Sequence, residues 1–339
     1  MHRRAWLIVS LPTVLVSLSC AVGCGGSSGT SGSTLTAPTA TTTTPPTTPT
    51  TPTAPTPTAP TPPTTPPPTG TGQYTTGVTG GETDLKVYIA SSPSGPWTNP
   101  QLVTISGVNA LLAIDPQPIL AADGSLLLIY AISTTNQLPS GSTRIGIASS
   151  TDGINFTQRN VVYTAGGDGF PNVSDPCAVL LPDGRVRVFI GNAGPRVYSA
   201  TSTDSSGVSF TGALDTGIRS NINAGVCGAM RTGSQYYLYE NGLVYSTSSD
   251  GLTFTSKGSV NLSGDAPSPI DIGGSYVMAW QSNGRVGPDQ GIASIATSSD
   301  GIVWNTVASG IFPGNMPGLV RNRSGQYLMY VVTLHGAIK

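Results

Sequence analysis

The sequence predicts an all-β protein: a single five-bladed β-propeller over residues 78–339, preceded by a signal peptide (1–23) and a disordered Ser/Thr/Pro-rich linker (24–77). Three observations predict the propeller. A hairpin pattern occurs five times, a turn motif recurs about 50 residues apart, and the two ends of the domain each carry half of one repeat. Together they indicate a closed ring of similar sheets rather than a helical solenoid.

The hairpin pattern is an apolar run, a short glycine turn, and a second apolar run that ends in an aromatic residue. Glycine in the turn supplies the positive φ that short hairpins need. The five copies span 115–130, 175–189, 224–239, 265–280 and 316–330, with turn glycines at Gly124, Gly184, Gly233, Gly274 and Gly325. Each copy therefore predicts the two inner strands of one blade.

The turn motif follows each of the first four hairpins and reads Ser/Thr-x-Asp-Gly, or a close variant, before an aromatic residue. It resembles the Asp box of sialidases and other propeller proteins. We expect its carboxylate to accept turn amides and its aromatic ring to pack between adjacent sheets. The acids are Asp152, Asp204, Asp250 and Asp300, and the aromatic residues are Phe156, Phe210, Phe254 and Trp304.

The fifth hairpin has no such turn after it, because the given sequence ends at Lys339. The missing outer half is found at the start of the domain, in residues 85–97. We therefore expect the last blade to combine inner strands from the C-terminus with outer strands from the N-terminus. Such a closure leaves no open seam between the first and last blades.

The first 23 residues have the architecture of an export signal, with a basic start and an apolar stretch too short to span a membrane. The residues around Cys24, Ala-Val-Gly-Cys, resemble a bacterial lipoprotein box. We expect lipid attachment at Cys24 in preference to Cys20, and ordinary cleavage with secretion is the alternative. The repeated Thr-Pro steps of the linker favour extended polyproline II. The protein is thus expected outside the cytoplasm, on the cell surface or outer membrane, or secreted.

Charged residues make up only 9% of the chain, and the formal net charge is −1. This composition argues against nucleic-acid binding, and membrane contact is expected only through the lipid anchor. We expect a monomer. Two cysteines fall in the propeller, Cys177 and Cys227, and the sequence leaves open whether they form a disulfide or remain two buried thiols.

Alignment of the hairpins on their turn glycines gives Asp115, Asp175 and Asp265 one common position. The other two repeats carry Ala224, after Asn223, and Met316, after Asn315. Because first strands line the channel of a propeller, we expect three carboxylates and two amides to form a ring at one mouth. Catalysis, sugar binding, calcium, solvation and simple repetition of an Asp-Pro strand entry all remain open explanations.

The chain resembles glycoside hydrolase family 43 in its Asp-Pro strand entries at 115–116 and 175–176, its Asp-Gly hairpins and its SSPSGPW segment at 91–97. The resemblance implies Asp115 as general base and Asp175 as the residue that tunes pKa values and orients. Where the family has Glu-Gly-Pro in its third blade, this chain has Ala224-Gly225-Val226. The general acid would then have to come from Glu240 or Asp265.

The leading hypothesis is an inverting glycoside hydrolase that acts on neutral poly- or oligosaccharides. The alternative is a carbohydrate-binding or adhesion propeller without catalysis. A sialidase-like protein is the third choice. Sialidases hold the substrate carboxylate with three arginines, and the arginines of this sequence do not fall at equivalent positions of the repeats. Besides the acids, the candidate sugar contacts are Asn223, Asn315, Trp280, Tyr239 and Phe170. No cofactor or protein-bound metal is required, with calcium in the channel left open.

Overall fold

The computed structural model describes residues 73–74, 83–108, 110, 112–133, 143–164, 173–191, 196–219, 226–283 and 291–334. Every described residue belongs to one compact unit of the chain, Pro63–Lys339. The predicted signal peptide, Cys24, nearly all of the linker, Phe170, Asn223 and Ala224 lie outside the described residues. Among the described residues, no helix could cross a membrane.

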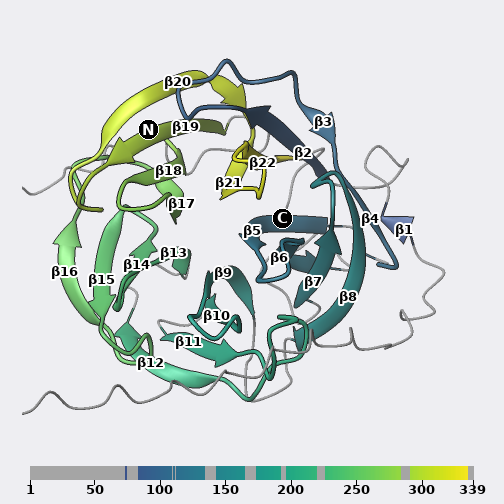
Figure 1. Cartoon of the computed structure of the whole chain (residues 1–339), viewed down its shortest axis with the longest axis vertical. Coiled ribbons are helices and arrows are strands. Elements are labelled where there is room, and N and C mark those ends of the chain that lie inside the picture. Colours follow the sequence, from purple (N-terminus) through teal and green to yellow (C-terminus); the bar gives the residue numbers. More distant parts are fainter. Residues whose placement is uncertain are drawn as a thin grey trace, which may run out of the picture. The chain divides into compact units, whose positions relative to one another are not determined.

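The described residues form five sheets arranged around one axis, which confirms the predicted five-bladed propeller (Figure 1). Blade one contains β5 (Leu112–Leu120), β6 (Leu126–Ser133), β7 (Arg144–Ser150) and β8 (Asn155–Thr164). Blade two contains β9 (Ser174–Leu180), β10 (Val186–Gly191), β11 (Arg196–Thr201) and β12 (Leu214–Arg219). Blade three contains β13 (Val226–Thr232), β14 (Gln235–Glu240), β15 (Val244–Ser248) and β16 (Thr255–Ser259). Blade four contains β17 (Asp265–Asp271), β18 (Tyr276–Gln281), β19 (Ile292–Ser298) and β20 (Asn305–Pro313).

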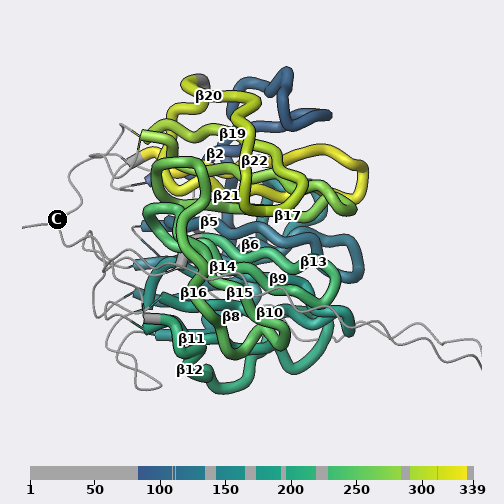
Figure 2. The backbone as a smooth tube through the Cα atoms, turned by 90° about the vertical axis from the view of Figure 1, so that its left-hand side faces the viewer, coloured from purple at the N-terminus to yellow at the C-terminus, as the bar shows by residue number. Residues whose placement is uncertain are grey.

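Blade five joins the two ends of the domain, as the sequence predicts. It contains β21 (Asn315–Arg321), β22 (Tyr327–Leu334), β2 (Thr83–Ala90) and β3 (Gln101–Leu102). Strands β22 and β2 pair without a break from Thr83 opposite Leu334 to Ala90 opposite Tyr327. In the edge-on view of Figure 2 these strands, from opposite ends of the chain, lie side by side. Hydrogen bonds along this whole ladder close the ring.

Blade one is the largest of the five sheets. Strand β4 (Thr104–Ser106) adds to its outer edge, pairing in parallel with β8, and β1 (Gln73–Tyr74) pairs with β4. The segment between blade five and β5 therefore also covers the outer edge of blade one.

Aromatic residues of the recurring turns pack against aromatic residues of the neighbouring blade. The ring of Phe156 lies edge-on to Tyr330, with 6.0 Å between centroids, and Trp304 lies edge-on to Tyr239 at 6.2 Å. Each tyrosine hydroxyl also donates a hydrogen bond of 2.8 Å to a turn carbonyl, Tyr330 to Gly153 and Tyr239 to Gly301. These contacts confirm the predicted packing between sheets, and they join adjacent blades.

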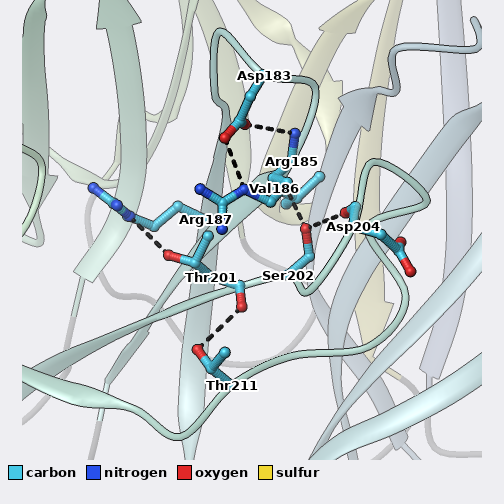
Figure 3. Close-up of polar contacts among 8 residues, drawn as sticks. All are labelled: Asp183, Arg185, Val186, Arg187, Thr201, Ser202, Asp204 and Thr211. Atoms are coloured by element: carbon cyan, nitrogen blue, oxygen red, sulfur yellow. Dashed lines mark hydrogen bonds and ion pairs between the residues drawn. The ribbon is translucent and has the colours of Figure 1, made fainter.

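The turn carboxylates of blades one, three and four accept hydrogen bonds from groups of their own turns. Asp250 accepts hydrogen bonds from the amides of Leu252 and Thr253 and from the hydroxyl of Ser248, and Asp152 and Asp300 repeat the pattern. The longer turn of blade two differs in its serine contact, because Ser202 donates to the backbone carbonyl of Asp204 (Figure 3). The Asp204 carboxylate accepts the amide of Ser206. All four acids therefore have structural surroundings, as the sequence predicts.

The turn carboxylates stabilise the folded protein only while they are ionised, so its stability should fall at acid pH. The amides of Thr253 and Leu252, with the Ser248 hydroxyl, lower the pKa of Asp250 to about 2. An Asp pKa in an unfolded chain is about 3.9, so this stabilisation is complete above that pH and is lost as pH falls towards 2. We expect the melting temperature to fall between about pH 4 and pH 2, and the fall to be shallower in Asp250→Asn. Equal slopes in the two proteins would contradict this role.

Cys177 is a free thiol and is wholly buried on β9, and burial raises its pKa. It therefore takes part in no disulfide, and it packs as a small apolar side chain beside Phe189 and Leu238.

Candidate active site at one mouth of the channel

The inner strands of blades one, two, four and five each begin with a β-bulge. The first bulged residue in each has left-handed backbone angles, with φ of 50° at Asp115, 45° at Asp175, 49° at Ala266 and 53° at Met316. This conformation costs about 1–2 kcal/mol for a residue with a side chain, and Asp tolerates it better than most. Because Ala and Met also adopt it here, the fold imposes the bulge, and the bulge does not require Asp.

These four bulge residues converge on one mouth of the channel. They line a single small cavity of about 10 Å³ together with Gln117 and Pro176. Asp115 is 8% exposed, and Asp175 accepts a 2.8 Å hydrogen bond from the hydroxyl of Ser174. The structure thus brings together two of the predicted carboxylates, Asp115 and Asp175, from adjacent blades.

The predicted place of Asp265 in this ring is wrong by one residue. Asp265 pairs with Gln281 before the bulge, and the bulge position itself is Ala266. The connection between β17 and β18 has four residues (272–275), whereas those of blades one, two and five have five. An alignment on turn glycines therefore slips by one residue in blade four.

The same error is larger in blade three, where the connection has only two residues (233–234). The register there pairs Val226 with Glu240, so Val226 rather than Ala224 corresponds to Asp115. Two glycines support this alignment. A Cβ on Gly228 would lie 2.2 Å from the carbonyl oxygen of Pro267, and a Cβ on Gly318 would lie 1.8 Å from that of Pro116. Both positions need glycine for the same close approach of the next blade.

Asp265 and Glu240 lie instead at a junction between blades three and four. The carboxylate of Asp265 accepts a 2.8 Å hydrogen bond from the amide of Gly242, and the side-chain oxygen of Asn241 accepts one of 3.1 Å from the amide of Ala266. Glu240 ends β14 and is 6% exposed. These hydrogen bonds connect the residues after β14 to the start of β17, where Asp265 directly precedes the ring residue Ala266.

Two predicted sugar contacts are wrong, because their rings have no free face. Trp280 is 3% exposed and donates from Nε1 to the carbonyl of Ser263, and Tyr239 is fully buried. Both belong to the core between blades three and four. Asn315 is also buried, directly before Met316, and its Nδ2 makes no hydrogen bond within the described residues.

Sequence reasoning missed Gln117, which lines the cavity beside both carboxylates. The available signal was its position two residues after Asp115, on the same channel-lining strand. Within the described part of the chain, no three His, Cys, Asp or Glu side chains are grouped so that they could hold a metal ion.

Comparisons with known proteins bear on the fold. The sequence matches no protein-family profile and no curated protein. Among solved structures, the chain is similar to the GH43_1 enzyme from Xanthomonas citri complexed with xylose, at 12% identity and a TM-score of 0.52 over 64% of this chain and 81% of that one. The complex with xylotriose gives 10% identity and a TM-score of 0.50 over 66% and 88%.

A family 117 glycoside hydrolase from Zobellia galactanivorans, at 14% identity, gives a TM-score of 0.46 over 66% of this chain and 85% of that one. The two Xanthomonas structures agree in fold with the resemblance inferred from the sequence: the chain is a five-bladed β-propeller of the kind found in enzymes of glycoside hydrolase family 43.

Proposed function

We propose that the protein is an inverting glycoside hydrolase that acts on neutral oligo- or polysaccharides at the mouth lined by Asp115 and Asp175. The observation that carries the proposal is the convergence of these two carboxylates from equivalent positions of adjacent blades. Two carboxylates near each other need a reason, because like charges at close range cost free energy. Glycoside hydrolysis supplies one, since its general base is a carboxylate, which a second carboxylate beside it can orient towards the sugar.

In this proposal Asp115 is the general base. It takes a proton from a water molecule as the water oxygen attacks the anomeric carbon, and the bond to the leaving oxygen breaks. Asp175 orients Asp115 and the sugar. Glu240 is the general acid and gives its proton to the leaving oxygen. We choose Glu240 because it pairs with Val226, the blade-three member of the ring.

The first substrates to test are pentose-containing oligosaccharides, since the Xanthomonas enzyme was solved with xylose and with xylotriose. The proposal also places the propeller outside the cytoplasm, anchored by a lipid at Cys24 or secreted, as a monomer.

Loss of a general acid lowers kcat/KM by an amount that depends on how acidic the leaving group is. Glu240→Gln should lower kcat/KM by about 10²–10⁴-fold on glycosides with a poorly acidic leaving group, because such a group departs only when protonated. The loss should be much smaller on dinitrophenyl glycosides, whose leaving group needs no proton. Asp265→Asn is the matched control, since its carboxylate lies at the same junction. An equal loss on both substrate types, or none, would remove Glu240 from the role.

A second candidate function is carbohydrate binding without catalysis. It is favoured by the composition of the ring, where Val226, Ala266 and Met316 carry no ionisable group. The panel of glycosides separates the two functions. Oligosaccharide binding that is weakened by Asp115→Asn, in a protein without turnover on any glycoside, would identify a binding module.

A further inference from the structure

The opposite end of the channel carries a second ring, formed by the residues five positions after the bulge. Its members are Leu120, Leu180, Arg231, Asp271 and Arg321. They border a cavity of about 280 Å³ that is lined by residues of all five inner strands. Small-molecule pockets begin at roughly 300 Å³, so this cavity suits a ligand no larger than a monosaccharide.

Two guanidinium groups in this ring are held in place but not neutralised. Arg231 lies over the ring of Tyr236 and Arg321 over that of Tyr327, each 5.7 Å from the centroid. The Nε of Arg231 is buried and makes no hydrogen bond among the described residues. The ion pairs in the described part of the chain are Asp183–Arg185 and Arg196–Asp215, so neither channel arginine is in one.

The third charged member, Asp271, is occupied by its own turn. Its Oδ1 accepts the amides of Gly273 and Gly274 at 2.8 and 3.0 Å. Two guanidinium groups and one carboxylate leave the ring with one net positive charge. The remaining wall is largely apolar, with Leu120, Leu180 and Ile270 among its members.

We propose that this cavity binds a small carboxylate ligand, with its carboxylate on Arg231 and Arg321 and its body against the apolar wall. A guanidinium group without an ion pair in a largely apolar wall favours an anion, and a carboxylate accepts charge-assisted hydrogen bonds from its Nη groups. A single negative charge matches the net charge of the ring. The site is distinct from the Asp115 mouth and does not depend on catalysis there, although Gln117 lines both cavities.

Calorimetric titration with sodium glucuronate and sodium benzoate tests this proposal, with glucose and inorganic phosphate as comparison ligands at constant ionic strength. We expect at least one carboxylate to bind, and to bind more tightly than either glucose or phosphate. Arg231→Gln should weaken that binding by tenfold or more. Arg159→Gln, on the outer strand β8, should bind as the native protein does.

The proposal is overturned if neither carboxylate binds, if glucose or phosphate binds at least as tightly, or if Arg231→Gln retains native affinity. Should Arg231→Gln fail to fold, Arg321→Gln replaces it, because Arg321 is an exposed side chain at the rim of the cavity. The same loss of affinity is expected there, and native affinity in Arg321→Gln would equally overturn the proposal. Glycosidase assays are not needed, so failure of the hydrolase proposal leaves this test intact.

Discussion

Asp115→Asn should lower kcat/KM for aryl xylosides or arabinosides by about 10²–10⁴-fold, the usual contribution of a general base. The amide keeps the size of the side chain but cannot take the proton of the attacking water. Asn also tolerates left-handed backbone angles, so the bulge at φ 50° should survive. Release of nitrophenol from a panel of glycosides measures the effect, with far-UV circular dichroism to show that the variant folds.

Asp123→Asn is the matched control for charge removal. Asp123 accepts hydrogen bonds from the amide and hydroxyl of Ser125 in the β5–β6 turn, at the other end of the same strand as Asp115. We expect native kcat/KM in this variant. Equal activity of Asp115→Asn and the native protein would contradict the assignment of Asp115 as base.

Trp304→Ala should destabilise the propeller by about 3–5 kcal/mol, the typical loss for a large buried aromatic residue. Trp304 is 2% exposed, packs edge-on against Tyr239 and donates from Nε1 to the carbonyl of Gly301. Its removal leaves a cavity between blades three and four. In a domain of this size the melting temperature should fall by roughly 10 °C, which thermal unfolding would measure.

Val303→Ala provides the comparison, because Val303 lies in the same turn but is 53% exposed. A surface substitution of this kind changes stability by about 0.5 kcal/mol or less. If both variants melted at the same temperature, the turn aromatic residues would not be holding adjacent blades together.

The architecture could be predicted from sequence because its signals are local. Five hairpins, their glycine turns and the recurring turn aromatic residues each depend on a few neighbouring residues, and blade counting follows from their spacing. The closure of blade five was also predictable, since the half-repeat before β5 complements the half-repeat that ends at β22. Asp115 and Asp175 were correctly aligned because their blades have turns of equal length.

The rest of the site depends on turn length and on tertiary burial. Shorter turns in blades three and four moved their glycines relative to the strands, and this misplaced Asp265 and Ala224. Trp280 lies near the end of β18, the strand that returns to the mouth, but its ring packs into the core. No local sequence pattern distinguishes an aromatic residue that faces the mouth from one that faces the core. The second ring was missed for the same reason, because Arg231 and Arg321 are equivalent only in the true register.

A crystal structure with bound oligosaccharide, beginning with xylotriose and continuing with any glycan the panel selects, tests the central claim most directly. We expect a sugar ring at the channel mouth, with a sugar oxygen or the attacking water within hydrogen-bonding distance of the Asp115 carboxylate and with Asp175 in contact with the same ligand. A saccharide bound on an outer strand, or in the cavity that Arg231 and Arg321 border, with the Asp115 mouth empty, would contradict the account.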